Sequence, residues 1–166
     1  AAETTDAARR LFREVEAGVV EEFGPHLIAK TFGVPREAVT PHGRVLDVLR
    51  LGDNALILSQ RLSAWCGHGP AIEEDMALTN TALDLLGQTR MWFSLAGQLE
   101  GAGRDEDALA YLRDAHHFRN VLLVERPDVD YAYTMVRQFF FDVWHYFLLE
   151  RLTQSSNADI AGIAAK

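Results

Sequence analysis

The amino-acid sequence predicts an all-α protein, an antiparallel bundle of helices, from three observations. Four of the five prolines precede residue 71, so residues 71–126 and 128–166 can form uninterrupted helices. Apolar residues recur at the spacing of a helix, and no stretch alternates apolar and polar residues for long enough to predict a sheet. At 166 residues and 48% apolar composition, the chain has room for one sizeable core.

The first 44 residues are expected to be an appendage of this bundle. A helix is predicted from Asp6 to Phe23, with apolar side chains on one face, and Gly24-Pro25 ends it. Glycine and proline punctuate the stretch up to Gly43, which predicts a linker. We therefore divide the chain into an N-terminal helical appendage with its linker, residues 1–44, and a helical bundle, residues 45–166.

Two long helices joined by a tight reversal are predicted next. The helix over 45–65 is apolar nearly all round, which predicts burial on several sides. The run Cys66-Gly67-His68-Gly69-Pro70 predicts the reversal, because glycine tolerates the left-handed conformation and proline suits the first turn of a helix. The helix over 71–101 opens with three acidic residues, which favour the positive end of the helix dipole, and stops at a Gly-Ala-Gly run.

The rest of the chain is predicted to hold one shorter helix and one long aromatic helix. The shorter helix spans about 105–119, Pro127 breaks the chain, and the aromatic helix spans about 130–153. A new helix begins near Ala158, so we expect a bundle truncated at the start of its fourth long helix. Such a bundle leaves an apolar groove, which a partner, a second copy or the N-terminal helix is expected to fill.

Composition and charge argue against several classes of protein. The 16 basic and 24 acidic residues give a net charge of −8, whereas nucleic acids and anionic membranes attract clustered Lys and Arg. The single Cys66 excludes an intramolecular disulfide and a multi-cysteine zinc site. The N-terminal residues lack the pattern of a signal peptide, and no apolar run is long enough to span a membrane. A cytoplasmic protein is therefore predicted.

Polar side chains recur on the core-facing sides of three predicted helices. The helical rotation of about 100° per residue places each set on one face. Because buried polar groups are nearly always hydrogen-bonded, we interpret them as a polar network inside the bundle, with no catalytic and no cofactor-binding residue among them. The set comprises Asp53, Gln60, Asn80, Asp84, Gln88, Gln138, Asp142 and His145.

One spacing within this set leaves an alternative open. Asp142-Val143-Trp144-His145 puts a carboxylate and an imidazole one turn apart, as in the bundles that hold two irons. Such a centre needs this motif twice and a Glu from each of two further helices. We find it once, with the shorter Asp, and expect no second copy. Gly87 stands three residues after Asp84, where a ligating histidine would be expected. We therefore predict no metal site at Asp84, Asp142 and His145, and a di-iron oxidase with its own centre is the alternative.

Three smaller groups are interpreted as structural or interface features. His116 and His117 would diverge by about 100° on a helix, so we expect surface or interface residues rather than joint ligands. Cys66-Gly67-His68 is interpreted as part of the turn. The run Phe139-Phe140-Phe141 points in three directions, so one ring is expected to leave the core and to reach a partner.

Several strings of the sequence resemble the C subunits of phenylacetyl-CoA epoxidases, the PaaC family. The resemblance covers residues 45–166 in unbroken order. The strings are Leu51 to Leu62 (LGDNALILSQRL), Trp65 to Pro70 (WCGHGP), Ala82 to Gln88 (ALDLLGQ), Phe118 to Glu125 (FRNVLLVE) and Asp142 to His145 (DVWH).

This resemblance implies a ferritin-like fold and a part in the aerobic degradation of phenylacetate. It implies that a catalytic A subunit holds the di-iron centre and epoxidises the aromatic ring of phenylacetyl-CoA, with O₂ and electrons from a reductase that uses NADPH, flavin and Fe–S groups. The C subunit is then a structural partner, with no cofactor of its own and no catalysis on its own. The expected partners are the A subunit and the other epoxidase subunits, and self-association is possible.

Overall fold

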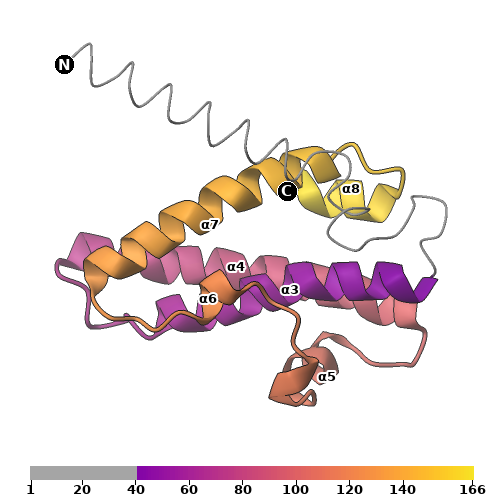
Figure 1. The fold of residues 1–166 in the computed structure, drawn as a ribbon, viewed down its shortest axis with the longest axis horizontal. Coiled ribbons are helices and arrows are strands. Elements are labelled where there is room, and N and C mark those ends of the chain that lie inside the picture. Colours follow the sequence, from indigo (N-terminus) through magenta and orange to yellow (C-terminus); the bar gives the residue numbers. More distant parts are fainter. Residues whose placement is uncertain (1–40) are drawn as a thin grey trace, which may run out of the picture. The chain divides into compact units, whose positions relative to one another are not determined.

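The computed structural model describes residues 41–166, and every regular element in this range is a helix (Figure 1). The elements are α3 (Pro41–Ser63), α4 (Ile72–Glu100), α5 (Glu106–Tyr111), the 3₁₀ helix η2 (Ala115–His117), α6 (Leu122–Glu125), α7 (Tyr131–Leu152) and α8 (Ala158–Ala164). The prediction of an all-α protein is confirmed. The helix predicted over 6–23 lies outside the described residues.

The described residues belong to two units, and the boundary between them falls inside α7. The first unit runs to Phe141 and contains α3, α4, α5, η2, α6 and the first half of α7. The second unit begins at Asp142 and contains the rest of α7 and α8. None of the helices within residues 41–166 combines the length and the hydropathy needed to cross a bilayer.

The core of the first unit lies between α3 and α4, which pack along one another as an antiparallel pair (Figure 1). Gly52 of α3 allows a close approach, because a Cβ at this position would overlap the ring of Phe93 on α4. Phe93 is itself fully buried. The core side chains are Val45, Val48, Leu49, Ala55, Leu56, Leu58 and Leu62 from α3, Leu78, Ala82, Leu85, Trp92, Phe93, Leu95 and Ala96 from α4, and Leu109, Val124 and Phe141 from the later segments.

The reversal predicted between α3 and α4 is present. Gly67 adopts a φ of 78°, in the left-handed region that glycine occupies without strain. The backbone N–H of His68 donates to the carbonyl of Trp65 at 2.8 Å, and that of Gly69 donates to Oδ2 of Asp75 at 3.0 Å. Asp75 thus holds the turn against the first turn of α4.

The first half of α7 is attached to Trp65, which lies in the turn just after the end of α3. Nε1 of Trp65 donates to Oγ1 of Thr134 at 3.1 Å, and the Trp65 ring packs edge-on against Tyr131 with centroids 5.6 Å apart. Arg137, which is buried, pairs with Asp128 at 2.6 Å and donates to the carbonyl of Arg126 at 3.0 Å. These contacts fix where α7 begins.

The helix predicted over 105–119 is wrong in its second half. Asp105 caps α5 by accepting from the N–H of Ala108 at 2.8 Å, but the helix ends at Tyr111. The chain then leaves the helical path, and η2 forms a single short turn at Ala115–His117. The cause is a contact distant in sequence, because the side chain of Arg113 turns inward to a carboxylate on α3.

We predict that Gly52→Ala lowers the free energy of unfolding by about 1–3 kcal/mol, since the added Cβ would overlap the buried Phe93 ring. The matched control is Gly87→Ala on α4, where an added Cβ meets nothing within 4 Å. Gly87→Ala should raise stability by about 0.5–1 kcal/mol, because alanine loses less backbone entropy in a helix. Denaturant melts of the two variants test this, and equal stabilities would contradict the close approach at Gly52.

Candidate functional site

The first unit is organised around a buried carboxylate, Asp53, on α3. Its two oxygens accept hydrogen bonds from Nη1 of Arg113 at 3.3 Å, from Nη2 of Arg113, and from the backbone N–H of Arg119 at 2.8 Å. The next residue on α3, Asn54, accepts from the backbone N–H of Val121 at 2.7 Å. Two consecutive side chains of α3 therefore hold both ends of the segment 113–121.

The guanidinium of Arg113 is almost as well enclosed as its partner, with only 4% of the side chain exposed. It lies between two aromatic rings, 5.0 Å from the centroid of Phe93 and 4.2 Å from that of Phe118. Its Nε donates to the carbonyl of Leu109. A planar, delocalised cation suits this position because it stacks on aromatic faces while its forked N–H groups meet a carboxylate.

This ion pair determines the path of the chain more than it adds net stability. Removal of two charges from water costs several kcal/mol for each ion, and the attraction between them offsets that cost only when the hydrogen bonds are complete. Asp53 has three donors, and Arg113 reaches two acceptor groups and two rings. Any other path for residues 113–121 would leave a charge buried without its partner.

The residues of the polar network predicted from the sequence differ in their burial. Asp53 takes its donors from Arg113 and Arg119, neither of which belongs to the predicted set. The members placed in buried positions are Asp53, Gln138 and His145, and Gln88 is half-buried. The members placed on the surface are Gln60, Asn80, Asp84 and Asp142.

Arg113 is the residue that the sequence interpretation missed. A signal for it was present, because a carboxylate in a helix as apolar as α3 requires a cation near it. The sequence offers several arginines, and nothing in their spacing distinguishes Arg113 from the others.

His145 and Asp142 lie in the second unit. The desolvation of the buried His145 ring lowers its pKa from 6.5 to about 4, so the imidazole is neutral at pH 7. The ring stacks on that of Trp144, with centroids 6.2 Å apart and planes inclined by 22°. Asp142, one turn earlier, is exposed.

Of the residues considered for an iron pair, Asp84 lies in the first unit, and Asp142 and His145 lie in the second unit. Asp84 is exposed on α4, and Gly87 at the next turn has no side chain to offer. Within residues 41–166, a single group of three or more His, Cys, Asp or Glu side chains could hold a metal ion, and Asp84, Asp142 and His145 are not members of it. The absence of a metal site at these three residues stays a prediction.

An exposed line of apolar side chains, which we name the α4 stripe, runs along α4. It consists of Ile72, Met76, Leu83 and Leu86, whose spacings of four, seven and three residues place them on one side of the helix. Exposed fractions of 72% for Ile72 and 61% for Leu83 show that these residues lie outside the core of the first unit. Exposed apolar side chains aligned along one side of a helix are a candidate surface for protein interaction.

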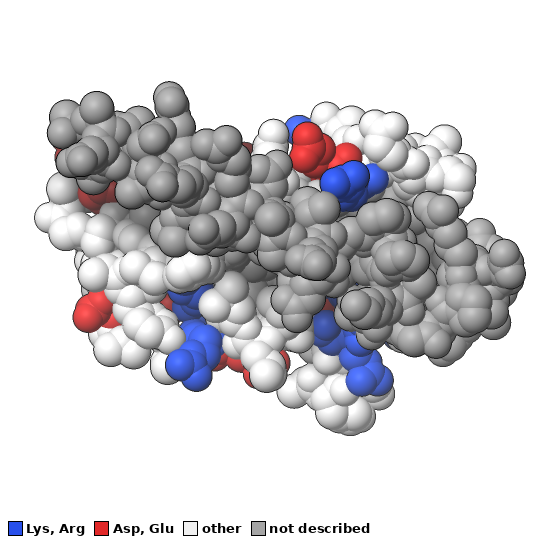
Figure 2. Space-filling model, turned by 45° about the horizontal axis from the view of Figure 1, so that its top comes forward, with Lys and Arg blue, Asp and Glu red and all other residues white. Residues whose placement is uncertain are grey.

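The aromatic run of α7 also contributes apolar surface. Phe141 is fully buried, while Phe139 and Phe140 are more than half exposed. The sequence predicts that one of the three rings leaves the core, whereas two rings do so. In Figure 2, most of the visible surface of the described residues is uncharged, and the acidic and basic side chains occur in small, separate groups.

The comparisons with known proteins first define the class. The family model for phenylacetic acid catabolic proteins matches residues 36–166, and the chain belongs to this family. Its helical structure agrees with the ferritin-like bundle expected for the family. The match begins before the boundary at residue 45 that the sequence predicted.

A curated relative is more specific. The chain is 54% identical over 118 residues to the C subunit of 1,2-phenylacetyl-CoA epoxidase from Escherichia coli strain K12. The aligned part covers 71% of this chain and 47% of the relative, so the chain spans about half the length of that protein.

We predict that Asp53→Ala lowers the free energy of unfolding by about 3–5 kcal/mol, because the buried Arg113 guanidinium loses its counter-charge. The control is Arg90→Ala, which breaks an exposed pair with Glu106 at 3.2 Å and should cost less than about 1 kcal/mol. Chemical denaturation measures both. If Asp53→Ala melts like Arg90→Ala, the carboxylate is hydrated and does not hold the segment.

Proposed function

We propose that the protein containing this chain is the structural C-type subunit of a phenylacetyl-CoA epoxidase complex in the cytoplasm. It pairs with a di-iron A subunit and supports it during the aerobic degradation of phenylacetate. The observation that carries the proposal is the 54% identity to the C subunit of such an epoxidase. Membership of the phenylacetic acid catabolic protein family supports it.

The surface of the first unit is suited to a supporting role. A helix that packs one side against α3 and exposes the α4 stripe on another can bury that stripe against a partner helix. Asn80 and Asp84 are exposed on the flank of the stripe and provide a polar edge. An apolar centre with a polar edge is the usual composition of a stable protein interface.

Catalysis is assigned to other subunits in this proposal. The di-iron centre, O₂ and the NADPH, flavin and Fe–S groups belong to partners, and this chain has no cofactor in the reaction. Support comes from the exposed Asp84 and from Gly87 at the position of an expected ligand.

We predict that Leu83→Asp in the full-length protein weakens its complex with the A subunit at least roughly tenfold, because a carboxylate then enters an apolar interface. Leu112→Asp is the matched control, since Leu112 is 81% exposed at the end of α5 and lies outside the stripe. Co-expression with the A subunit, followed by a binding titration of the purified pair, measures the difference.

Two outcomes would contradict the use of this surface. One is equal binding by the Leu83→Asp and Leu112→Asp proteins. The other is a lower melting temperature of the isolated Leu83→Asp protein, which would show that the rest of its own chain covers the α4 stripe.

We also predict that the purified full-length protein contains only substoichiometric iron and still supports an active complex. The alternative, an oxidase with its own centre, requires two tightly bound irons per chain. Metal analysis of the wild-type protein and of Asp84→Asn and Asp142→Asn variants separates the two. Two irons that are lost in either variant would contradict the structural role.

A further inference from the structure

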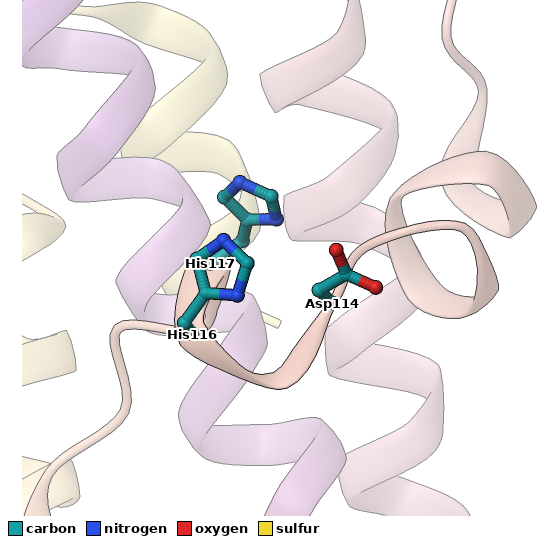
Figure 3. Close-up of side chains that lie close together, drawn as sticks. All are labelled: Asp114, His116 and His117. Carbon is teal, nitrogen blue, oxygen red and sulfur yellow. The ribbon is translucent and has the colours of Figure 1, made fainter.

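Two histidines and an aspartate come together on the exposed turn between α5 and α6. Asp114, His116 and His117 each offer one ligand atom, and these atoms all lie within 4.8 Å of one another (Figure 3). The imidazole rings of His116 and His117 are tilted by 42°, with centroids 4.0 Å apart. All three side chains are exposed.

The expectation that the side chains of His116 and His117 diverge is wrong, since the centroids of their rings lie 4.0 Å apart. Both residues lie outside the α-helices. They lie on η2, and a 3₁₀ turn of three residues brings positions i and i+3 into line. Asp114 and His117 have this relation, and the N–H of His117 donates to the carbonyl of Asp114 at 2.9 Å. The expectation that the carboxylate-x-x-His spacing occurs once, at Asp142 and His145, is wrong, because Asp114 and His117 repeat it on this surface turn.

The backbone that carries these side chains is fixed on both sides. Arg113, just before the turn, is buried against Asp53, and the N–H of Arg119, just after it, donates to the same carboxylate. Phe118 packs beneath the Arg113 guanidinium. With the main chain held in this way, only side-chain rotations are needed to converge the three donors, which lowers the entropic cost of binding an ion.

We propose that Asp114, His116 and His117 form a surface site for a divalent transition-metal ion of the zinc class. Ions of this class bind well to two imidazoles and one carboxylate, whereas Mg²⁺ and Ca²⁺ prefer sites made of oxygen ligands alone. Bonds of about 2.0–2.1 Å place tetrahedral ligands about 3.3 Å apart, so rotations of the exposed side chains must close part of the present separation.

The site has three protein ligands, so water or a group from another molecule completes the coordination of the ion. Its donors are distinct from Asp84, Asp142 and His145, and the site is independent of the proposed role in the epoxidase complex. The competing interpretation is a solvated turn whose histidines bind nothing.

The test is a titration of the tag-free full-length protein with Zn²⁺ in competition with a chromophoric chelator. We expect one Zn²⁺ per chain at this site, lost in the double variant His116→Ala/His117→Ala and at least about tenfold weaker in Asp114→Asn. The control is His68→Ala, an exposed histidine on the turn between α3 and α4, which should bind as the wild type does.

A second readout uses the resonances of the imidazole rings. Zn²⁺ at less than one equivalent should shift the signals of His116 and His117 and leave that of His68 in place. The same Zn²⁺ affinity in the wild type and the double variant would overturn the proposal. An equal loss of affinity in His68→Ala would also overturn it, because that result indicates nonspecific binding to surface histidines.

Discussion

The buried pair of Asp53 and Arg113 is the constraint on which the rest of the first unit depends. α3 is apolar on nearly every side, so an anion within it is tolerable only beside a cation that is equally well enclosed. Arg113 meets this need from a position 60 residues further along the chain, and Phe93 and Phe118 cover its faces. α5 ends before Arg113, and the following segment is held across α3.

The same constraint shapes the turn at η2. Residues 113–121 are bound to α3 through Asp53 and Asn54. The short turn that carries Asp114, His116 and His117 exists because its two flanks are attached to one carboxylate. The buried pair thus supports the turn that carries the proposed metal site.

The sequence predicts well what depends on local signals. Helical periodicity, the glycines of the α3–α4 turn and the late Pro127 place the long helices to within a few residues of Pro41–Ser63, Ile72–Glu100 and Tyr131–Leu152. It fails where a distant partner decides. The helix expected to reach residue 119 stops at Tyr111 because Arg113 pairs with Asp53. The rings of His116 and His117, expected to diverge, lie with their centroids 4.0 Å apart on the turn that follows. The position of a residue around a helix indicates the direction of its side chain, but not whether another element covers it. Asn80 and Asp84 are therefore predicted inside the bundle, whereas the structure exposes them.

Amide hydrogen exchange in an Asp53→Asn variant tests the role of the buried pair most directly. The N–H of Arg119 donates to the Asp53 carboxylate. The N–H of Leu109 serves for comparison, because it belongs to the first turn of α5 and bonds to the carbonyl of Asp105 at 3.1 Å. Arg119 and Val121 should be protected in the wild type and exchange much faster in the variant, while α3 and α4 stay protected. Fast exchange of the Arg119 and Val121 amides in the wild type would contradict this role, and so would unchanged protection of these two amides in the variant.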